Sequence, residues 1–488
     1  MAPGNSHTPA PHMAWPGTLA AARGWLCAAS LIVLCAGCAG TPAIDQSDAG
    51  KTTSYPSGSR GFDIEAVPAE GDSLSAVDLY LSIPFPSLIF EKTAAGFRSR
   101  CELSARLTDR LSGQLSGEVA WAETTIVQRY EATQSFEPVI RMKRIPAPPG
   151  SYRVDVTLED IVNGRRASRA QSVTIWDPAL SGPALGRISL VDVRRDGAPV
   201  PQISFFVPMK PDSIPCTVKT YDFSTSTDSR VGIRLLRIPG DTNVAIVPYY
   251  YPTVALPTGH SLADFGNPDT AYQTEFGMRA SRRIAAAEFR IPPLEEGLYR
   301  IECLALTQTP GGTDTLLAAS RYYSIKGPGF PRPVTYAELI DAAVYIATNR
   351  EMAVLRSARG PDEQRKRFEE FWLSLAGDPV KAAALIRTYY SRVEEANRLF
   401  TNIKEGWRTD RGMLYCVLGP PAEITNRLDN QSWYYDLSGN AAENLYVFKH
   451  VTRQAKGLTV EDYLLYRQSV YEMLWGRMIF KWRNGEIL

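Results

Sequence analysis

The stretch Gly406-Trp407-Arg408-Thr409-Asp410-Arg411-Gly412 places a carboxylate beside a guanidinium in a segment of turn composition. An Asp in such a turn can bond its own backbone two residues on, and Gly accepts a positive φ. Three roles follow for Asp410 and Arg411. Asp410 is a turn acceptor, with Arg411 as its ion-pair partner or as a neighbour of Glu405; the pair forms a rim that grips a partner; or Asp410 acts in catalysis.

Histidine is too sparse to support the common catalytic constellations. Only His260 and His450 follow residue 38, and they fall in different expected domains. This argues against Ser-His-Asp sites and against zinc sites built on several His. No phosphate-binding loop or nucleophile elbow follows residue 38 either. Two carboxylates brought together by folding leave no local signature, so Glu423 or Asp436 beside Asp410 stays open as a hydrolytic pair. We expect no cofactor and no metal.

Cys38 is the residue with the clearest predicted chemistry, which is acylation. An apolar run at 24–37 follows Arg23 and is too short to span a bilayer. Its end, Cys35-Ala36-Gly37-Cys38, resembles the bacterial lipobox; an ordinary cleaved signal is the alternative. The resemblance implies a lipoprotein signal at 1–38, and Ala39 implies the outer membrane with the body facing the periplasm. Residues 39–60 are polar and predict a flexible tether.

Charge and cysteine content narrow the partners. The chain has 53 basic and 52 acidic residues, a net charge of +1, which gives no electrostatic case for nucleic acid. Of the four cysteines after residue 38, only Cys216 and Cys303 share an expected domain and could pair. We favour four small buried thiols, because four widely spaced cysteines do not suit a zinc site.

Two β-sandwich domains are predicted at 61–178 and 185–326. Runs such as Val77–Ile83 alternate apolar and polar side chains, as half-buried antiparallel strands do. The endings of the two segments are alike: Pro149–Val156 and Glu296–Cys303 each carry a Gly turn that leads into a Tyr-Arg strand. We interpret this as a weak internal repeat of immunoglobulin-like sandwiches.

The Pro/Gly-rich residues 327–334 predict a linker, and helical periodicity begins at 335. Thr335 and Glu338 form an expected capping box, and further helices are predicted at 361–376, 380–403 and 471–483. Gly406 is expected to end the third of these helices as a left-handed cap. The apolar run Met413–Leu418 is expected to be a central strand. The apolar stripe of the last helix predicts core packing, with a docking surface as the alternative.

Residues 335–488 resemble the GWxTD domain, a family of exported bacterial proteins. The similarity rests on the Gly406–Gly412 motif, the Tyr389–Asn397 helix before it, and the strands at Trp433–Asp436 and Tyr446–Phe448 after it. The family is also similar to this chain in its lipoprotein signal and its β-sandwich domains. The family has no established activity, so the resemblance implies an α+β fold and no reaction.

The expected architecture is therefore multidomain: two all-β sandwiches followed by an α+β domain. We expect a membrane-anchored envelope lipoprotein that acts as a non-catalytic interaction or scaffold module and binds another envelope protein. The alternative is a carbohydrate- or peptide-binding protein or a carboxylate-dependent hydrolase. Exposed aromatic residues at 249–251, or an aromatic and acidic rim of Trp433, Tyr434, Tyr435 and Asp436, would favour that alternative. The sequence leaves the oligomeric state open.

Overall fold

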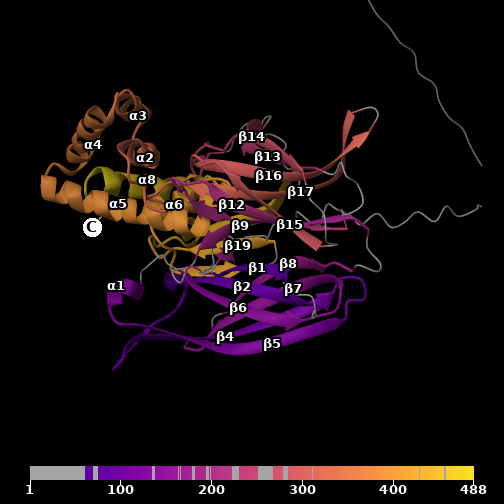
Figure 1. The fold of residues 1–488 in the computed structure, drawn as a ribbon. Helices are drawn as coiled ribbons and strands as arrows, with labels where there is room; N and C mark the ends of the chain where they lie inside the picture. The colour runs from indigo at the N-terminus through magenta and orange to yellow at the C-terminus, as the bar shows by residue number, and fades with distance from the viewer. Residues whose placement is uncertain are drawn as a thin grey trace, which may run out of the picture. The chain divides into compact units, whose positions relative to one another are not determined.

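Strands dominate the described residues between 61 and 326, and helices gather in the C-terminal part of the described chain (Figure 1). The computed structural model describes residues 61–69, 75–133, 138–162, 164, 166–177, 182–193, 197, 199–222, 230–250, 268–277, 284–309, 312–427, 429–455 and 458–487. Cys38, the tether at 39–60, Tyr251 and His260 lie outside the described residues. No helix among the described residues is long and apolar enough to cross a membrane.

The first two sheets share one hydrophobic core. The sheet order β1-β2-β6 faces the order β3-β4-β7-β8, with β5 paired to β4. Leu79 and Leu81 from one sheet and Leu103, Val154 and Val156 from the other are buried in this core, because alternate side chains of a strand point to the same face. The strands are β1 (Asp63–Pro68), β2 (Ala76–Pro84), β3 (Glu91–Thr93), β4 (Gly96–Asp109), β5 (Leu115–Val127), β6 (Pro138–Pro146), β7 (Gly150–Asp160) and β8 (Arg166–Ile175).

The next two sheets form a second core in the same manner. Their orders are β10-β9-β12-β15 and β11-β17-β16-β13-β14, and Val218, Ile233 and Ile301 are buried between them. The strands are β9 (Ala184–Val193), β10 (Pro199–Pro201), β11 (Phe206–Pro208), β12 (Ile214–Tyr221), β13 (Arg230–Ile238), β14 (Asp269–Gly277), β15 (Ile284–Ile291), β16 (Gly297–Thr309) and β17 (Gly312–Lys326).

The two strand–turn–strand endings that are alike in sequence are also alike in pairing. Gly150 at the start of β7 pairs with Ile175 of β8, and Gly297 at the start of β16 pairs with Ile325 of β17. The neighbours correspond as well: β5-β4-β7-β8 matches β14-β13-β16-β17, and β1-β2-β6 matches β9-β12-β15. Tyr152 donates its hydroxyl to the carbonyl of Pro148 at 2.8 Å, which fixes the turn into β7.

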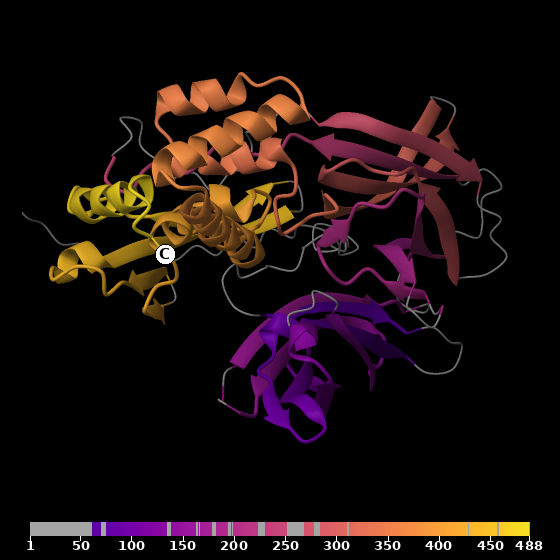
Figure 2. The same ribbon diagram turned by 90° about the vertical axis from the view of Figure 1, so that its left-hand side faces the viewer.

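The C-terminal region packs helices and one sheet around a third core (Figure 2). Trp372, Tyr389, Leu414, Trp433 and Trp482 are each at most 1% exposed there. The helices are α2 (Tyr336–Ala342), α3 (Asn349–Arg356), α4 (Pro361–Ala376), α5 (Pro379–Phe400), α6 (Asp410–Leu418), the short α7 (Ala441–Asn444) and α8 (Tyr471–Arg483). The sheet has the order β18-β19-β20-β21, from β18 (Glu423–Asn426), β19 (Asn430–Tyr434), β20 (Leu445–Ala455) and β21 (Leu458–Leu465).

Several expected boundaries are confirmed. The capping box of Thr335 and Glu338 opens α2, and α4 and α8 span the expected residues. Helix α5 begins after the N-cap Asp378 but ends at Phe400, before the expected Ile403. Helix α3 was not expected, although Thr348 and Glu351 form a second capping box at its start.

The run Met413–Leu418 is a helix, so its prediction as a strand was wrong. All nine residues of α6 are buried, and a helix that is apolar on every side shows no 3.6-residue period to separate it from a buried strand. Gly406 was also misplaced, because it opens a 3-10 turn (Gly406–Arg408) six residues after α5 ends.

The cysteines that the structure describes are unpaired. Cys101, Cys216, Cys303 and Cys416 are all free and buried, as the favoured interpretation expected. Burial raises the pKa of the Cys101 thiol to about 11 and that of Cys303 to about 12, so these thiols are protonated and unreactive at neutral pH.

Candidate functional site

Two glycines of the Gly406–Gly412 stretch are fixed by close packing of the backbone. A Cβ on Gly406 would collide with the carbonyl of Ala396 in α5, and a Cβ on Gly412 would collide with the carbonyl of Gly406. Neither glycine has a positive φ, so the expected turn glycine and left-handed cap are both wrong. The stretch instead stacks α6 directly on the turn, and the turn on α5.

Thr409 joins the turn to α6. Its backbone is extended, and its Oγ1 accepts a hydrogen bond from the amide of Gly412 at 3.1 Å, which makes it the N-cap of the helix. The same hydroxyl donates to the carbonyl of Gly406 at 2.7 Å. One side chain therefore satisfies groups on both sides of the junction.

Trp407 lies in the C-terminal core and is 3% exposed. Its amide donates to Oδ1 of Asn397 at 3.3 Å, and its carbonyl accepts from the hydroxyl of Tyr345 at 2.9 Å. The guanidinium of Arg408 lies 4.2 Å from the centre of the Trp407 ring. The indole is thus both a core residue and a platform for a cation.

Asp410 is bound by Arg467, in the loop between β21 and α8. Nη2 of Arg467 donates to Oδ1 at 2.6 Å and Nη1 to Oδ2 at 3.2 Å, and the amide of Leu465 donates to Oδ2 at 2.7 Å. Burial raises the pKa of Asp410, while the charge of Arg467 opposes the shift. The carboxylate pairs with Arg467 rather than Arg411, so the expected local ion pair is wrong.

Arg411 is stacked between aromatic rings. It is 2% exposed, and its guanidinium lies 3.9 Å from the centre of the Tyr463 ring and 5.0 Å from that of Phe400. Nη1 lies 3.4 Å from Oε1 of Gln431. Burial lowers the pKa of Arg411 to about 10. A side chain this buried cannot form the exposed rim that was one of its three expected roles.

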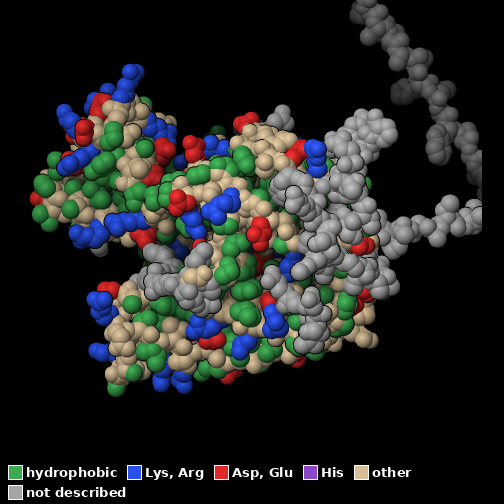
Figure 3. Space-filling model, in the orientation of Figure 1, with side chains coloured by type: hydrophobic (Ala, Val, Ile, Leu, Met, Phe, Trp, Pro, Cys, Tyr) green, Lys and Arg blue, Asp and Glu red, His purple; other side chains and the backbone are tan. Residues whose placement is uncertain are grey.

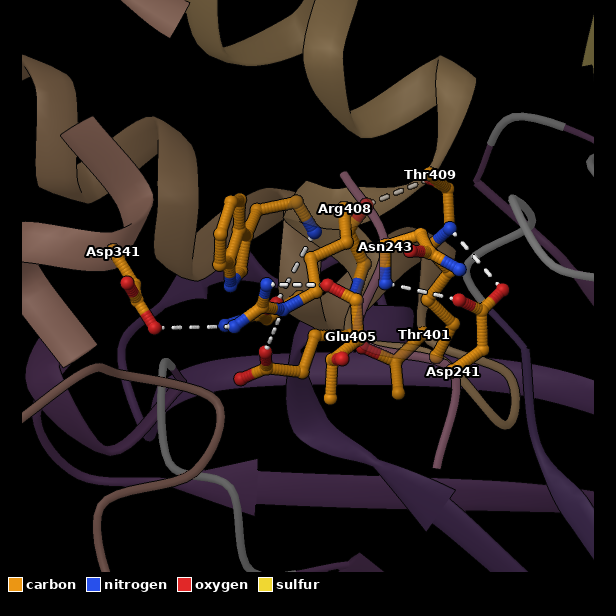
Figure 4. A network of polar contacts seen from close by, with 12 residues as sticks. Asp241, Asn243, Asp341, Thr401, Glu405, Arg408 and Thr409 are labelled. Carbon is orange, nitrogen blue, oxygen red and sulfur yellow. Dashed lines mark hydrogen bonds and ion pairs between the residues drawn. The ribbon is translucent and has the colours of Figure 1, made fainter. Parts of the chain in front are cut away.

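Arg408 and Arg467 also contact residues 241–250, an irregular piece of chain that follows β13 and contains a turn at 248–249; we call it the held segment. Figure 4 shows its first residues, Asp241 and Asn243, near Arg408. Most of the hydrogen bonds to it are made to main-chain atoms. They are Arg408 Nη1 to Thr242 O at 2.8 Å, Ala245 N to Tyr345 Oη at 3.3 Å, Arg467 Nη2 to Ile246 O at 3.0 Å and Gln468 N to Pro248 O at 3.2 Å. We call Tyr345, Arg408, Arg467 and Gln468 the main-chain clamp.

Side chains of the held segment add to this attachment. Lys404 forms an ion pair with Asp241 at 3.3 Å. Val244, Val247 and Tyr249 are partly buried against the C-terminal core. The held segment is therefore bound by hydrogen bonds to its main chain and by apolar contacts with the C-terminal core.

A cavity of about 160 Å³ borders the clamp between residues 327–333, α2 and the Gly406–Arg408 turn. Most of its carboxylates are engaged: Asp341 binds Arg356 and Arg408, Glu405 binds Arg408, and Glu338 caps α2. Burial raises the pKa of the remaining carboxylate, Glu296. Among the residues that the structure describes, no group of three or more His, Cys, Asp or Glu could hold a metal ion.

The expected aromatic rim does not form. Trp433 and Tyr435 are each 1% exposed; the indole donates to Oε1 of Gln431 at 2.8 Å, and the hydroxyl of Tyr435 donates to Gly419 O at 3.1 Å. Tyr434 is half-buried and Asp436 is exposed. Strand alternation sends neighbouring side chains to opposite faces, so these four residues do not share a surface.

Sequence reasoning missed Tyr345, Arg467, Gln468 and the held segment. They come from three separate parts of the chain, and Arg467 is 57 residues from Asp410. Only Arg408 lay inside the motif. Because Arg467 and Asp410 are far apart in the sequence, no short-range pattern predicts that they pair. Their contact is visible only in the folded structure.

The comparisons with known proteins agree with the motif. Residues 312–484 match the GWxTD domain, and the match begins within β17 rather than at residue 335. No curated protein matches the chain.

Solved structures with some likeness include red sea bream transglutaminase, at 7% identity over 56% of this chain and 31% of that one, with a TM-score of 0.16. Escherichia coli alpha-2-macroglobulin has 10% identity over 58% of this chain and 15% of its own, with a TM-score of 0.16. The C-terminal domain of the Streptococcus agalactiae AgI/II polypeptide BspA has 10% identity over 53% of this chain and 99% of its own, with a TM-score of 0.15. Less than a third of the first two proteins is matched.

Proposed function

Because residues 312–484 form a GWxTD domain, we propose that this chain is a cell-envelope lipoprotein whose GWxTD domain binds a polypeptide segment through its main chain without catalysing a reaction. The main-chain clamp is the observation that carries the proposal. Four of its contacts go to main-chain atoms of the held segment, at Thr242, Ala245, Ile246 and Pro248. Recognition through the backbone, with pockets for alternate side chains, is how proteins bind extended peptides.

The engagement of the polar groups supports a binding role over catalysis. Asp410 accepts from Arg467 and from the amide of Leu465, and Arg411 is stacked between two rings. A general acid or base must reach the proton that it transfers, and Asp410 is only 8% exposed. The burial of Trp433 and Tyr435 counts against carbohydrate stacking on those rings.

The rest of the chain serves this module as anchor and spacer. Cys38 is the lipid attachment point at the outer membrane, and the partner is another envelope protein in the periplasm. The two N-terminal pairs of sheets are immunoglobulin-like sandwich repeats, which the matching strand neighbours and the hydroxyl contact of Tyr152 support. Acidic and basic side chains are interspersed on the face drawn in Figure 3, which gives no basic footprint for nucleic acid.

Hydrogen exchange in an Arg408→Ala variant tests the proposal. We expect faster amide exchange in residues 241–250, because the guanidinium that binds Thr242 O is lost. The amide of Ala245 is the best reporter, because it donates to the hydroxyl of Tyr345 in the clamp. Arg356→Ala is the matched control, since Arg356 also binds Asp341 but, among the residues that the structure describes, makes no hydrogen bond or ion pair with the held segment. Equal exchange of residues 241–250 in the two variants would show that the motif does not bind this segment.

A further inference from the structure

The held segment depends on its surroundings for its shape. Two hydrogen bonds lie within it: Asn243 N donates to Asp241 Oδ1 at 2.9 Å, and Tyr250 N donates to Val247 O at 3.2 Å. It belongs to no sheet, because β13 ends at Ile238. The main-chain clamp and the apolar contacts with the C-terminal core therefore support its conformation. The clamp contacts main-chain atoms, which a peptide of similar sequence also offers.

One edge of the held segment faces solvent. Thr242, Asn243, Ile246 and Tyr250 are exposed, while Pro248 is buried and Val244, Ala245 and Val247 are partly buried. Side chains on the exposed edge are free to vary without loss of contact. The inward positions, from Val244 to Pro248 except Ile246, would decide which peptide sequences fit.

We propose that the held segment is a built-in occupant of a peptide site, and that a segment of a partner protein with the same inward pattern and the same final turn replaces it. This inference rests on the proposed function, and it names the class of partner. The clamp contacts main-chain atoms, so a partner segment could form the same hydrogen bonds as the held segment. What changes is only which chain supplies the backbone.

The contacts define the partner segment position by position. An acidic residue at the place of Asp241 meets Lys404. Apolar β-branched residues at the places of Val244 and Val247 meet the core. Any residue except proline suits the place of Ala245, because its backbone amide donates to the hydroxyl of Tyr345. Proline suits the place of Pro248, where the carbonyl rather than an amide is used.

A synthetic peptide with the sequence of residues 241–250 is the probe. Its affinity is measured by fluorescence anisotropy for the full chain and for a Val244→Asp/Val247→Asp variant, whose own segment is expelled by buried charge. We expect the variant to bind the peptide about tenfold more tightly or better, because a tethered occupant competes at an effective concentration on the order of mM. A control peptide with aspartate at both valine positions should bind neither chain.

Cross-linking separates a failure of exchange from a failure of the clamp, and it needs no destabilised variant. A peptide with a photoreactive group at the exposed Ile246 position should label residues next to Arg467 in the unaltered chain at high peptide concentration. Labelling elsewhere, or no saturable binding to a folded double variant, overturns the exchange. If the peptide fails while Arg408→Ala still accelerates exchange at 241–250, the proposed clamp stands and only the partner class is wrong.

Discussion

The residues of the Gly406–Gly412 motif are explained by packing and capping more than by exposed chemistry. Gly406 and Gly412 permit backbone contact, Thr409 caps α6, and Asp410 binds the loop after β21. The pattern is therefore largely a fold signature, and it contacts the held segment through Arg408 and, indirectly, through Arg467, the partner of Asp410. Both guanidiniums reach the held segment.

Gly412→Ala is the most direct test of this explanation. The new methyl group would collide with the carbonyl of Gly406, and overpacking of this kind costs about 1–3 kcal/mol. We expect a lower thermal midpoint for the C-terminal transition, followed by the near-ultraviolet signal of its tryptophans. Gly476→Ala in α8 is the control, because a Cβ there meets nothing within 4 Å and helix propensity favours Ala by up to about 1 kcal/mol. Equal stability of both variants would refute the packing argument.

The spacing of residues predicted local features such as helix caps, but it did not predict contacts between residues far apart in the sequence. The capping box of Thr335 and Glu338 was correctly expected from their spacing. The partner of Asp410 was wrong, because an ion pair between residues 410 and 467 is set by how β21 passes α6. The burial of Arg411 was likewise invisible, since two aromatic rings from α5 and β21 create its site.

At the scale of elements, periodicity worked where one face is buried and failed where all faces are. Alternation located β2 and β7, and the 3.6-residue period located α4, α5 and α8. It could not identify α6, whose residues are all buried. The N-cap Thr409 was the better signal there, and the capping box of Thr348 and Glu351 was a signal for α3 that went unused.

The start of α3 is also bound to the end of α8, and this link predicts an acid-sensitive stability. Glu351 caps α3 and accepts from Nη1 and Nη2 of Arg483, both at 2.9 Å. These hydrogen bonds from Arg483 lower the pKa of Glu351 from 4.5 to about 2. A carboxylate with a lowered pKa stabilises the fold above its unfolded pKa, and this contribution is lost as the pH falls from about 4.5 towards 2.

We therefore expect Glu351→Gln to lower the stability of the C-terminal region by about 1 kcal/mol at pH 7, because the cap loses its charged acceptor. The variant should also lose less stability than the unaltered chain between pH 4.5 and pH 3, as measured by urea unfolding. Glu369→Gln removes an equal charge from an exposed pair with Arg365 and serves as the control. Parallel pH profiles for the unaltered chain and Glu351→Gln would contradict the assignment.

On the scale of the whole molecule, contacts between distant segments connect the successive parts of the described chain. Glu65 of β1 is fully buried and binds Arg321 of β17 at 2.7 and 2.8 Å. The held segment leaves β13 and packs on the core of the GWxTD domain. Arg187 also binds Glu65, at 3.1 Å, so this buried carboxylate is compensated by two arginines and its contact with Arg321 stabilises the link between β1 and β17. The exchange proposed for the held segment would then loosen one connection and keep the other.

The proposed lipid anchor is also a feature of the whole molecule, and the two cysteines at the end of the apolar run allow a matched test. Cys38 is the expected acceptor, and Cys35 precedes it by three residues. In a bacterial host supplied with an alkyne-labelled fatty acid, we expect Cys35→Ser to keep the label and Cys38→Ser to lose it and remain unprocessed, since acylation requires the thiol. Label retained in Cys38→Ser would move the acceptor, whereas absence of label from the unaltered chain would mean an ordinary cleaved signal. In that case the clamp would act in a released protein, and the partner would have to be sought beyond the membrane surface.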